Sequence, residues 1–243
     1  MPGVGPCRRG ARAMTDTGWW LVFVGSAYLL GSIPFGLLIG LQRGVDLREH
    51  GSGNIGATNA RRVLGPGPGS AVLALDVAKG AAPVLIAGAA MGVIGRRDLP
   101  PGEQAWWLAV AAAGPVGHMF PVWLRLRGGK GVATGFGALV SVWPALTAAT
   151  LAALAVWFVG LRLTRLVGVA SSLAALALPI AATGAWALLG DPALGPAGRI
   201  VAAWPTIAVT SALALVVIAK HRVNLRLALE ARRSGRRGAA GSG

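Results

Sequence analysis

The chain has 243 residues, of which 54% are hydrophobic and 13% are charged, and its lysines and arginines outnumber its acidic residues by 23 to 8. In a soluble protein a net charge of +15 would indicate nucleic-acid binding, but here the cations lie mainly between and after apolar runs near 20 residues long. The composition therefore predicts an integral membrane protein and argues against nucleic acid as a partner. Cys7 is the single cysteine, which excludes an intrachain disulfide and a multi-cysteine metal site.

The apolar runs predict an all-α, polytopic membrane protein with about seven transmembrane helices, two of them short. The first run is far longer than the hydrophobic region of a signal peptide, so we expect it to be a span. We expect an N-terminal extension at residues 1–18, one transmembrane domain at residues 19–227 and a disordered basic tail at residues 228–243. The predicted spans are Trp19–Leu41, Ser70–Ile94, Ala105–Leu124, Val132–Trp143, Ala145–Leu161, Val167–Leu189 and Ile200–Ala219.

The two short spans come from one uncharged stretch, Val132–Leu161. As a single helix this stretch would be about 45 Å long, against a hydrocarbon core of about 30 Å. Pro144 lies near its middle, where a proline removes a backbone hydrogen bond. We therefore expect two short antiparallel segments that meet at Trp143 and Pro144. With seven spans, most of the 23 lysines and arginines fall on one side with the C-terminus, which the positive-inside bias identifies as the cytoplasm.

The first loop on this side, residues 50–69, reads HGSGNIGATNARRVLGPGPG. Its small and polar residues are typical of a flexible connector. Glycines also permit backbone turns that cradle an anion, however, and Arg61 and Arg62 carry the forked group that matches phosphate oxygens. In the next span, Asp76 and Lys79 lie three residues apart on one helix face. They form either a structural ion pair or part of a polar site inside the bundle.

The second loop contains RGGKGVAT, residues 127–134, between two apolar stretches. Gly128, Gly129 and Gly131 allow close backbone approach around the cation of Lys130, and the helix that follows would direct free N–H groups toward an anion. A tight turn with an ordinary interfacial lysine is the alternative interpretation. The segment does not match the nucleotide P-loop pattern.

His221 leaves the last span beside Lys220 and Arg222, whose charges disfavour an imidazolium. This environment suits a neutral base, although an interfacial histidine is often structural. The pattern G-x-S-x-G does not occur, and none of the three histidines has an aspartate five positions later. A lipase-type nucleophile and the H-x4-D pair of many acyltransferases are therefore not indicated. Carboxylates and histidines do not cluster at metal-ligand spacing, so we expect no metal and no cofactor.

Taken together, these motifs resemble those of the PlsY-type bacterial acyl-phosphate:glycerol-3-phosphate acyltransferases. The similarity runs in order over residues 19–227. It implies a seven-helix inner-membrane enzyme with its motifs on the cytoplasmic face. The implied reaction transfers an acyl group from acyl phosphate to the 1-hydroxyl of glycerol-3-phosphate, giving 1-acyl-glycerol-3-phosphate (lysophosphatidic acid) and phosphate in phospholipid biosynthesis. The matching segments are GSIPFG at 31–36, SGNIGATNARRVLG at 52–65, LDVAKG at 75–80, GHMFPVWLRLRGGKGVAT at 117–134 and KHRVNL at 220–225.

The resemblance also implies roles for residues in these motifs. The expected catalytic residues are Ser52, Arg62, His221 and Asn224, the last two near the acceptor hydroxyl. The glycine-lysine motif is expected to hold glycerol-3-phosphate, and the first loop to be shaped by its Asn and Thr residues. The expected substrate-binding residues are Asn54, Thr58, Asn59, Asp76, Lys79, Gly128, Gly129, Lys130 and Gly131.

We expect Lys130, Arg62 and backbone N–H groups to hold two phosphates near each other at the membrane interface, with the acyl chain of the donor in the lipid. Because an acyl phosphate is already activated, Ser52 would act as a hydrogen-bonding residue and no acyl-enzyme is needed. The proton of the attacking hydroxyl would pass to His221 or to the donor's own phosphate. The alternative function is a small transporter or flippase for a phosphorylated solute or lipid. The oligomeric state stays open.

Overall fold

The computed structural model describes the backbone of residues 9–240 and the side chains of residues 16–222. Within that part of the chain it contains helices and no strands, which confirms the predicted all-α class. The helices are α1 (Arg9–Gly31), α2 (Phe35–Leu41), α3 (Ala57–Leu64), α4 (Pro66–Ala90), α5 (Pro101–Met119), the 3-10 helix η1 (Val122–Leu124), α6 (Val132–Val140), α7 (Ala145–Thr164), α8 (Val167–Leu189), α9 (Pro196–Ala202) and α10 (Trp204–Ala240).

Among the described residues, six helical segments are long and apolar enough to cross a membrane. The first, Asp16–Leu41, comprises α1 and α2, and the third, Pro101–Leu124, comprises α5 and η1. The others are α4, α7, α8 and the part of α10 at Trp204–Arg222. All six overlap predicted spans. The remaining predicted span corresponds to α6, whose 9 residues reach only about 13 Å and cannot cross a bilayer.

The predicted break near Pro144 is confirmed, because α6 ends at Val140 and α7 begins at Ala145. One short helix takes the place of the expected two, however. α7 has 20 residues, about 30 Å, and is long enough to cross a bilayer alone. It continues past its predicted end to Thr164, whose Oγ1 donates a hydrogen bond to Gly160 O at 2.7 Å in the last turn, and Arg162 of this turn is exposed.

The first predicted span is divided in two. α1 ends at Gly31, and α2 begins at Phe35 directly after Pro34, whose ring nitrogen has no N–H to continue the helix. At this break the Ile33 carbonyl accepts hydrogen bonds from the Phe35 N–H (3.1 Å) and from Lys79 Nζ of α4 (2.7 Å). A buried cation of one span therefore stabilises the break in another.

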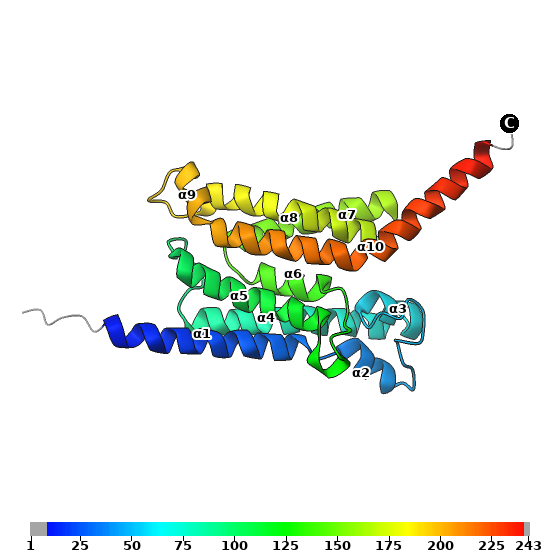
Figure 1. The fold of residues 1–243 in the computed structure, drawn as a ribbon, viewed down its shortest axis with the longest axis horizontal. Helices are drawn as coiled ribbons and strands as arrows, with labels where there is room; N and C mark the ends of the chain where they lie inside the picture. The colour runs from blue at the N-terminus through cyan, green and yellow to red at the C-terminus, as the bar shows by residue number, and fades with distance from the viewer. Residues whose placement is uncertain (1–8, 241–243) are drawn as a thin grey trace, which may run out of the picture.

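The long helices form two groups that lie side by side in Figure 1, with α1, α4, α5 and α6 in one and α7, α8 and α10 in the other. The core between and within them contains the fully buried Val84, Trp107 and Leu146. Gly80 brings α4 and α6 into direct contact, because a Cβ at this position would lie 2.1 Å from Thr134 O. Such small residues allow membrane helices to pack closely.

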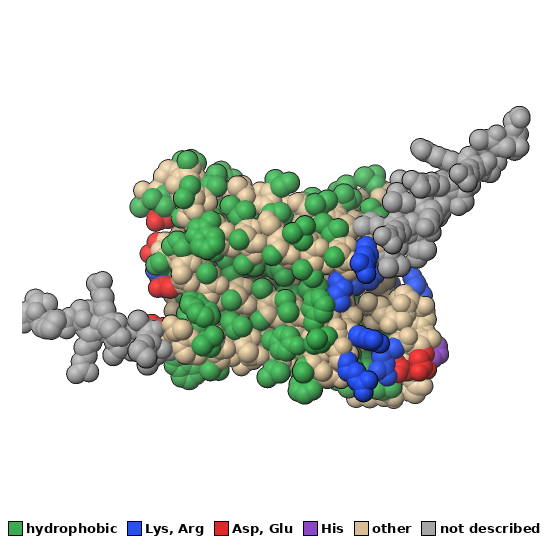
Figure 2. All heavy atoms as spheres, viewed as in Figure 1, with side chains coloured by type: hydrophobic (Ala, Val, Ile, Leu, Met, Phe, Trp, Pro, Cys, Tyr) green, Lys and Arg blue, Asp and Glu red, His purple; other side chains and the backbone are tan. Residues whose placement is uncertain are grey.

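Charge and apolar surface are separated along the long axis of the molecule. Figure 2 shows hydrophobic side chains over the middle and most of the visible Lys and Arg side chains at one end, near α2, α3 and the loop after α5. The exposed apolar residues include Val159, Ile180, Leu188 and Leu215. This distribution is that of an integral membrane protein whose two ends contact water.

Candidate active site

A cavity of about 780 Å³ lies between the two groups of helices, and it reaches the end where the motif loops lie. Its polar part is lined by α3, by Asp76 of α4, by the end of α5, by the start of α6 and by His221 in the middle of α10. Its apolar part is lined by α6, α7, α8 and the middle of α10. A ligand with a charged group and an apolar tail would contact both parts at once.

Asn59 folds the first loop back on itself. Its side chain is 2% exposed, its Oδ1 accepts a hydrogen bond from the Ser52 N–H (2.8 Å), and its Nδ2 donates to two backbone carbonyls at 3.0 and 3.1 Å. Asn54 Oδ1 accepts a hydrogen bond from the Gly56 N–H (2.9 Å), a turn that asparagine favours. These bonds fix Ser52 beside the start of α3.

Three exposed side chains of this segment, Ser52, Thr58 and Arg62, line the polar part of the cavity. Thr58 and Arg62 are four residues apart on α3 and so share one face of the helix. The neighbouring Arg61 is exposed but does not line the cavity, and Gly69 packs against its backbone. The structure therefore distinguishes two adjacent arginines that the sequence leaves equivalent.

The glycines of the second loop pack against the end of α5. The Gly128 N–H donates a hydrogen bond to Met119 O (3.2 Å), and the Gly129 N–H donates to His118 O (3.0 Å). A side chain has no room at Gly129, where a Cβ would lie 2.0 Å from His118 Nε2. Gly131 has φ +75°, a left-handed conformation through which the chain enters α6.

Lys130 is half-buried and lines the cavity just before α6. Burial lowers the pKa of its ammonium group below the ordinary value, because desolvation disfavours the charged form. The first turn of α6 also lines the cavity through Val132 and Ala133. The helical hydrogen bonds of α6 begin with the bond from the Gly135 N–H to Gly131 O (2.7 Å), so the N–H groups of these two residues have no acceptor within the helix. A cation beside a helix N-terminus is suited to bind an anion.

A buried charged group lies beneath the polar part. Asp76 and Lys79 are 2% and 3% exposed, and Lys79 Nζ lies 2.9 Å from Asp76 Oδ1. His118 is 6% exposed, and its Nδ1 lies 3.6 Å from the same oxygen. Asp76 and His118 line the cavity, whereas Lys79 does not. Asp76 therefore lines the cavity, as a residue of a polar site would. Lys79 does not reach the cavity and has the structural role of the ion-pair partner of Asp76.

His221 is 2% exposed and lines the cavity from α10. Its Nδ1 lies 2.9 Å from Val217 O. Because a carbonyl can only accept a hydrogen bond, Nδ1 carries the ring proton of the neutral imidazole and Nε2 is the acceptor. The adjacent Lys220 Nζ donates to Met119 O (3.0 Å) and so joins α10 to the end of α5. The side chain of Asn224, the other predicted catalytic residue of α10, lies outside the part of the chain whose side chains the structure describes.

The apolar part of the cavity is lined by α7 and α8 together. Leu154, Trp157 and Phe158 of α7 and Ala175 and Leu178 of α8 belong to this lining. The lining also includes half-buried and buried residues of α6 and α10. An apolar lining of this extent is suited to a long hydrocarbon chain.

Two ionisable residues that line the cavity, Arg165 and His118, were absent from the predicted site. Arg165 follows α7 with φ 57°, and its N–H donates to Leu161 O (2.8 Å). The only sequence signal for it is its place in a loop on the same side as the motifs, which Arg162 shares without reaching the cavity. The signal for His118 is its place at the start of the segment that ends in the glycine-lysine loop.

The structure thus brings most of the predicted residues to one place. Gly128 and Gly129 lie behind Lys130 against α5, and Lys79 lies behind Asp76. The predicted residues that line the cavity are Ser52, Asn54, Thr58, Asn59, Arg62, Asp76, Lys130, Gly131 and His221.

Comparisons with known proteins match most of the chain. A family model described as glycerol-3-phosphate acyltransferase matches residues 21–231. The chain is 42% identical over 208 residues to the glycerol-3-phosphate acyltransferase of Anaeromyxobacter dehalogenans (strain 2CP-1 / ATCC BAA-258), covering 84% of this chain and 91% of that protein. It is also similar to crystal structures of PlsY (YgiH), an integral membrane glycerol 3-phosphate acyltransferase. The glycerol 3-phosphate form gives a TM-score of 0.69 at 34% identity, and the lysophosphatidic acid form 0.67 at 33%. Each comparison covers 88% of this chain and 93% of the other.

Proposed function

The chain belongs to the glycerol-3-phosphate acyltransferase family, and from this premise we propose that its acyl donor is an acyl phosphate and its product 1-acyl-glycerol-3-phosphate. Family membership makes the protein an integral membrane acyltransferase and decides against the transporter alternative. The observation that carries the proposal is the single cavity, in which cationic groups and a helix N-terminus adjoin an extensive apolar lining.

Glycerol-3-phosphate binds with its phosphate at Lys130 and the first turn of α6. The ammonium group supplies a charge, and the N–H groups of Val132 and Ala133 supply donors without side chains in the way. The tetrahedral phosphate can approach closely because glycines flank the lysine on both sides. Its 1-hydroxyl is then directed toward the interior of the cavity.

Acyl phosphate binds with its phosphate at Arg62 and its chain between α7 and α8. The guanidinium fork of Arg62 can contact two phosphate oxygens, and Ser52 and Thr58 on the same side supply hydroxyl donors. Arg165 lies at the inner end of α7 and adds a second cation to the cavity. The acyl chain contacts the apolar lining that begins at the same place.

The reaction needs one displacement at the acyl carbon. The 1-hydroxyl oxygen of glycerol-3-phosphate forms a bond to that carbon, and the bond from the carbon to the phosphate oxygen breaks, so inorganic phosphate leaves. The proton of the hydroxyl passes to His221 Nε2, which the hydrogen bond from Nδ1 to Val217 O keeps free of a proton. Ser52 donates a hydrogen bond and forms no acyl-enzyme, because the donor is already activated.

Placement of the two substrates contributes much of the rate. Well-oriented reactants can save up to about 7–11 kcal/mol of the barrier, provided that their reacting atoms are held close together. Here two anionic groups bind to cations that line one cavity, which offsets their mutual repulsion. The side chains of the cavity therefore hold and orient the two substrates, and His221 removes the proton.

The enzyme is placed in the cytoplasmic membrane with this cavity on the cytoplasmic side. Arg43 follows α2, Arg125 and Arg127 follow η1, and all three are exposed next to the motif loops, as the positive-inside bias requires. Glycerol-3-phosphate reaches the cavity from water, and the acyl chain reaches it from membrane lipid.

The test uses purified protein with a long-chain acyl phosphate and glycerol-3-phosphate. Phosphate and lysophosphatidic acid should appear in equal amounts, and long-chain acyl-CoA should not replace the donor. Arg62→Ala should lose most of the activity, while the matched variant Arg61→Ala, whose side chain does not line the cavity, should retain it. Product formation from acyl-CoA alone, or equal losses in the two variants, would contradict the proposal.

A further inference from the structure

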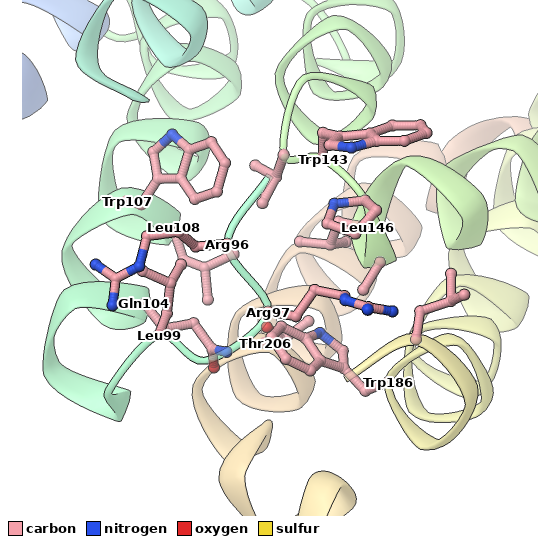
Figure 3. Close-up of a pocket in the computed structure, with 14 residues that line it drawn as sticks. Arg96, Arg97, Leu99, Gln104, Trp107, Leu108, Trp143, Leu146, Trp186 and Thr206 are labelled. Carbon is pink, nitrogen blue, oxygen red and sulfur yellow. The ribbon is translucent and has the colours of Figure 1, made fainter. Parts of the chain in front are cut away.

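A second, much smaller pocket lies at the opposite end of the molecule, and the substrate cavity does not include it. Its volume is about 10 Å³, and it is lined by the first turns of α5 and α10, the end of α8 and the turn between α6 and α7 (Figure 3). Most of its wall is apolar, with Leu99, Trp107, Leu108 and Leu146 among its members.

Three polar side chains in this wall are deeply buried and lack a hydrogen-bond partner among the residues that the structure describes. Gln104, Trp186 and Thr206 are 3%, 7% and 1% exposed. The unpartnered atoms are both amide atoms of Gln104, Trp186 Nε1 and Thr206 Oγ1. Their polar ends lie toward the same part of the pocket in Figure 3. By contrast, the buried Trp107 Nε1 donates to Val84 O at 3.1 Å.

The other polar members of the wall are already occupied or reach water. Arg96 makes hydrogen bonds to Asp98 and Glu103, and Arg97 is exposed. Neither arginine depends on a hydrogen bond with the three buried groups. A buried amide, indole N–H or hydroxyl without a partner is costly, so these groups require a ligand that the protein itself does not supply.

We propose that Gln104, Trp186 and Thr206 form a binding site for one water molecule. Two of the unpartnered groups, the Gln104 amide nitrogen and Trp186 Nε1, are donors, and they match the two lone pairs of water. The other two, Gln104 Oε1 and Thr206 Oγ1, can accept its two hydrogens. A volume of about 10 Å³ admits one water and excludes any larger ligand.

This water joins the two groups of helices. Gln104 belongs to α5 of one group, whereas Trp186 and Thr206 belong to α8 and α10 of the other. The site lies at the end away from the substrate cavity, so it fixes the groups where they meet while the opposite end stays open. Bound waters with several partners contribute to structure in this way.

The test is Thr206→Val, which keeps the shape of the side chain and removes its hydroxyl. If Thr206 Oγ1 binds the water, the substitution takes away a partner, and the apparent Tm in detergent should fall by about 2–6 °C. If the hydroxyl binds nothing, valine removes an unsatisfied polar group and the Tm should rise or stay the same. A Tm that is unchanged or higher overturns the proposal.

Thr210→Val is the matched control, because Thr210 is also fully buried on α10 but its Oγ1 donates to a carbonyl of its own helix, Thr206 O (2.7 Å), a type of bond that adds little to helix stability. Its Tm should change little, and a loss equal to that of Thr206→Val would overturn the proposal. A high-resolution crystal structure gives a second readout. Density for a water within about 3.2 Å of Thr206 Oγ1 and Trp186 Nε1 is expected. A dry pocket would refute the site whatever the Tm values are.

Discussion

Replacing Gly129 with alanine should disable the glycerol-3-phosphate site without removing any charge. A Cβ at Gly129 would lie 2.0 Å from His118 Nε2, and ordinary van der Waals contact begins near 3.4 Å. Either the loop or the imidazole must therefore move by more than 1 Å. The imidazole is 6% exposed and lies beside Asp76, so we expect the loop to move.

Lys130 is the next residue in that loop, so its ammonium group would shift with the backbone. A misplacement of about 1 Å can cost about 100-fold in rate, which corresponds to about 2.7 kcal/mol. We therefore predict that Gly129→Ala lowers kcat/KM for glycerol-3-phosphate about 100-fold, mostly through KM. Saturation by acyl phosphate should change little. Steady-state kinetics with each substrate varied in turn measures the two effects separately.

Two further variants make the reasoning refutable. Gly102→Ala is the control, because a Cβ at Gly102 meets nothing within 4 Å, and its kinetics should match the wild type. The double variant Gly129→Ala/His118→Ala removes the three nearest atoms that the new methyl group would meet. It should recover part of the loss relative to Gly129→Ala. An unchanged KM in Gly129→Ala, or a double variant worse than both singles combined, would show that this contact does not position the loop.

Three other predictions follow from the site. Because burial lowers the pKa of Lys130, its ammonium loses its proton at a pH below the usual value of about 10.4. KM for glycerol-3-phosphate should then rise as pH increases toward 10, and Lys130→Arg, which stays charged, should show a flat KM; a flat wild-type profile would exclude the contact. Ala175→Phe should narrow the apolar lining and shift the preference toward shorter acyl phosphates, whereas an equal loss for all chain lengths would contradict the chain's placement there. Asp76→Asn leaves Lys79 as a buried cation without its carboxylate, so stability should fall by about 3–5 kcal/mol and recover in Asp76→Asn/Lys79→Met; chemical denaturation that finds no difference would refute the pairing.

Much of the fold is predictable because the bilayer requires long apolar helices. Hydropathy located all six membrane-crossing segments, and the length of Val132–Leu161 with Pro144 at its middle located the break between α6 and α7. The division of the first span at Pro34 was missed. Its apolar residues continue on both sides, and the hydrogen bond from Lys79 that stabilises the break comes from another helix.

The sequence predicted which loops form the site, but not which of their side chains, and which residues of the helices, face the cavity. Glycine, asparagine and cationic residues identify loops that could hold phosphate, and the structure places both loops on one cavity. Which of Arg61 and Arg62 faces that cavity depends on how α3 packs on α4, and Lys79 faces away from it because of the break at Ile33. Arg165 carries no motif at all. These assignments depend on tertiary packing, which a local pattern of residues does not contain.

The most direct measurement of the central claim is the accessibility of the cavity's polar part from each side of the membrane. Single cysteines replace Ser52, Lys130 or Arg165 in a Cys7→Ser background, and a membrane-impermeant maleimide is applied to inverted vesicles and to intact spheroplasts. All three positions should react only in inverted vesicles. Labelling of any two positions from opposite sides would mean that no common cavity holds the two phosphates.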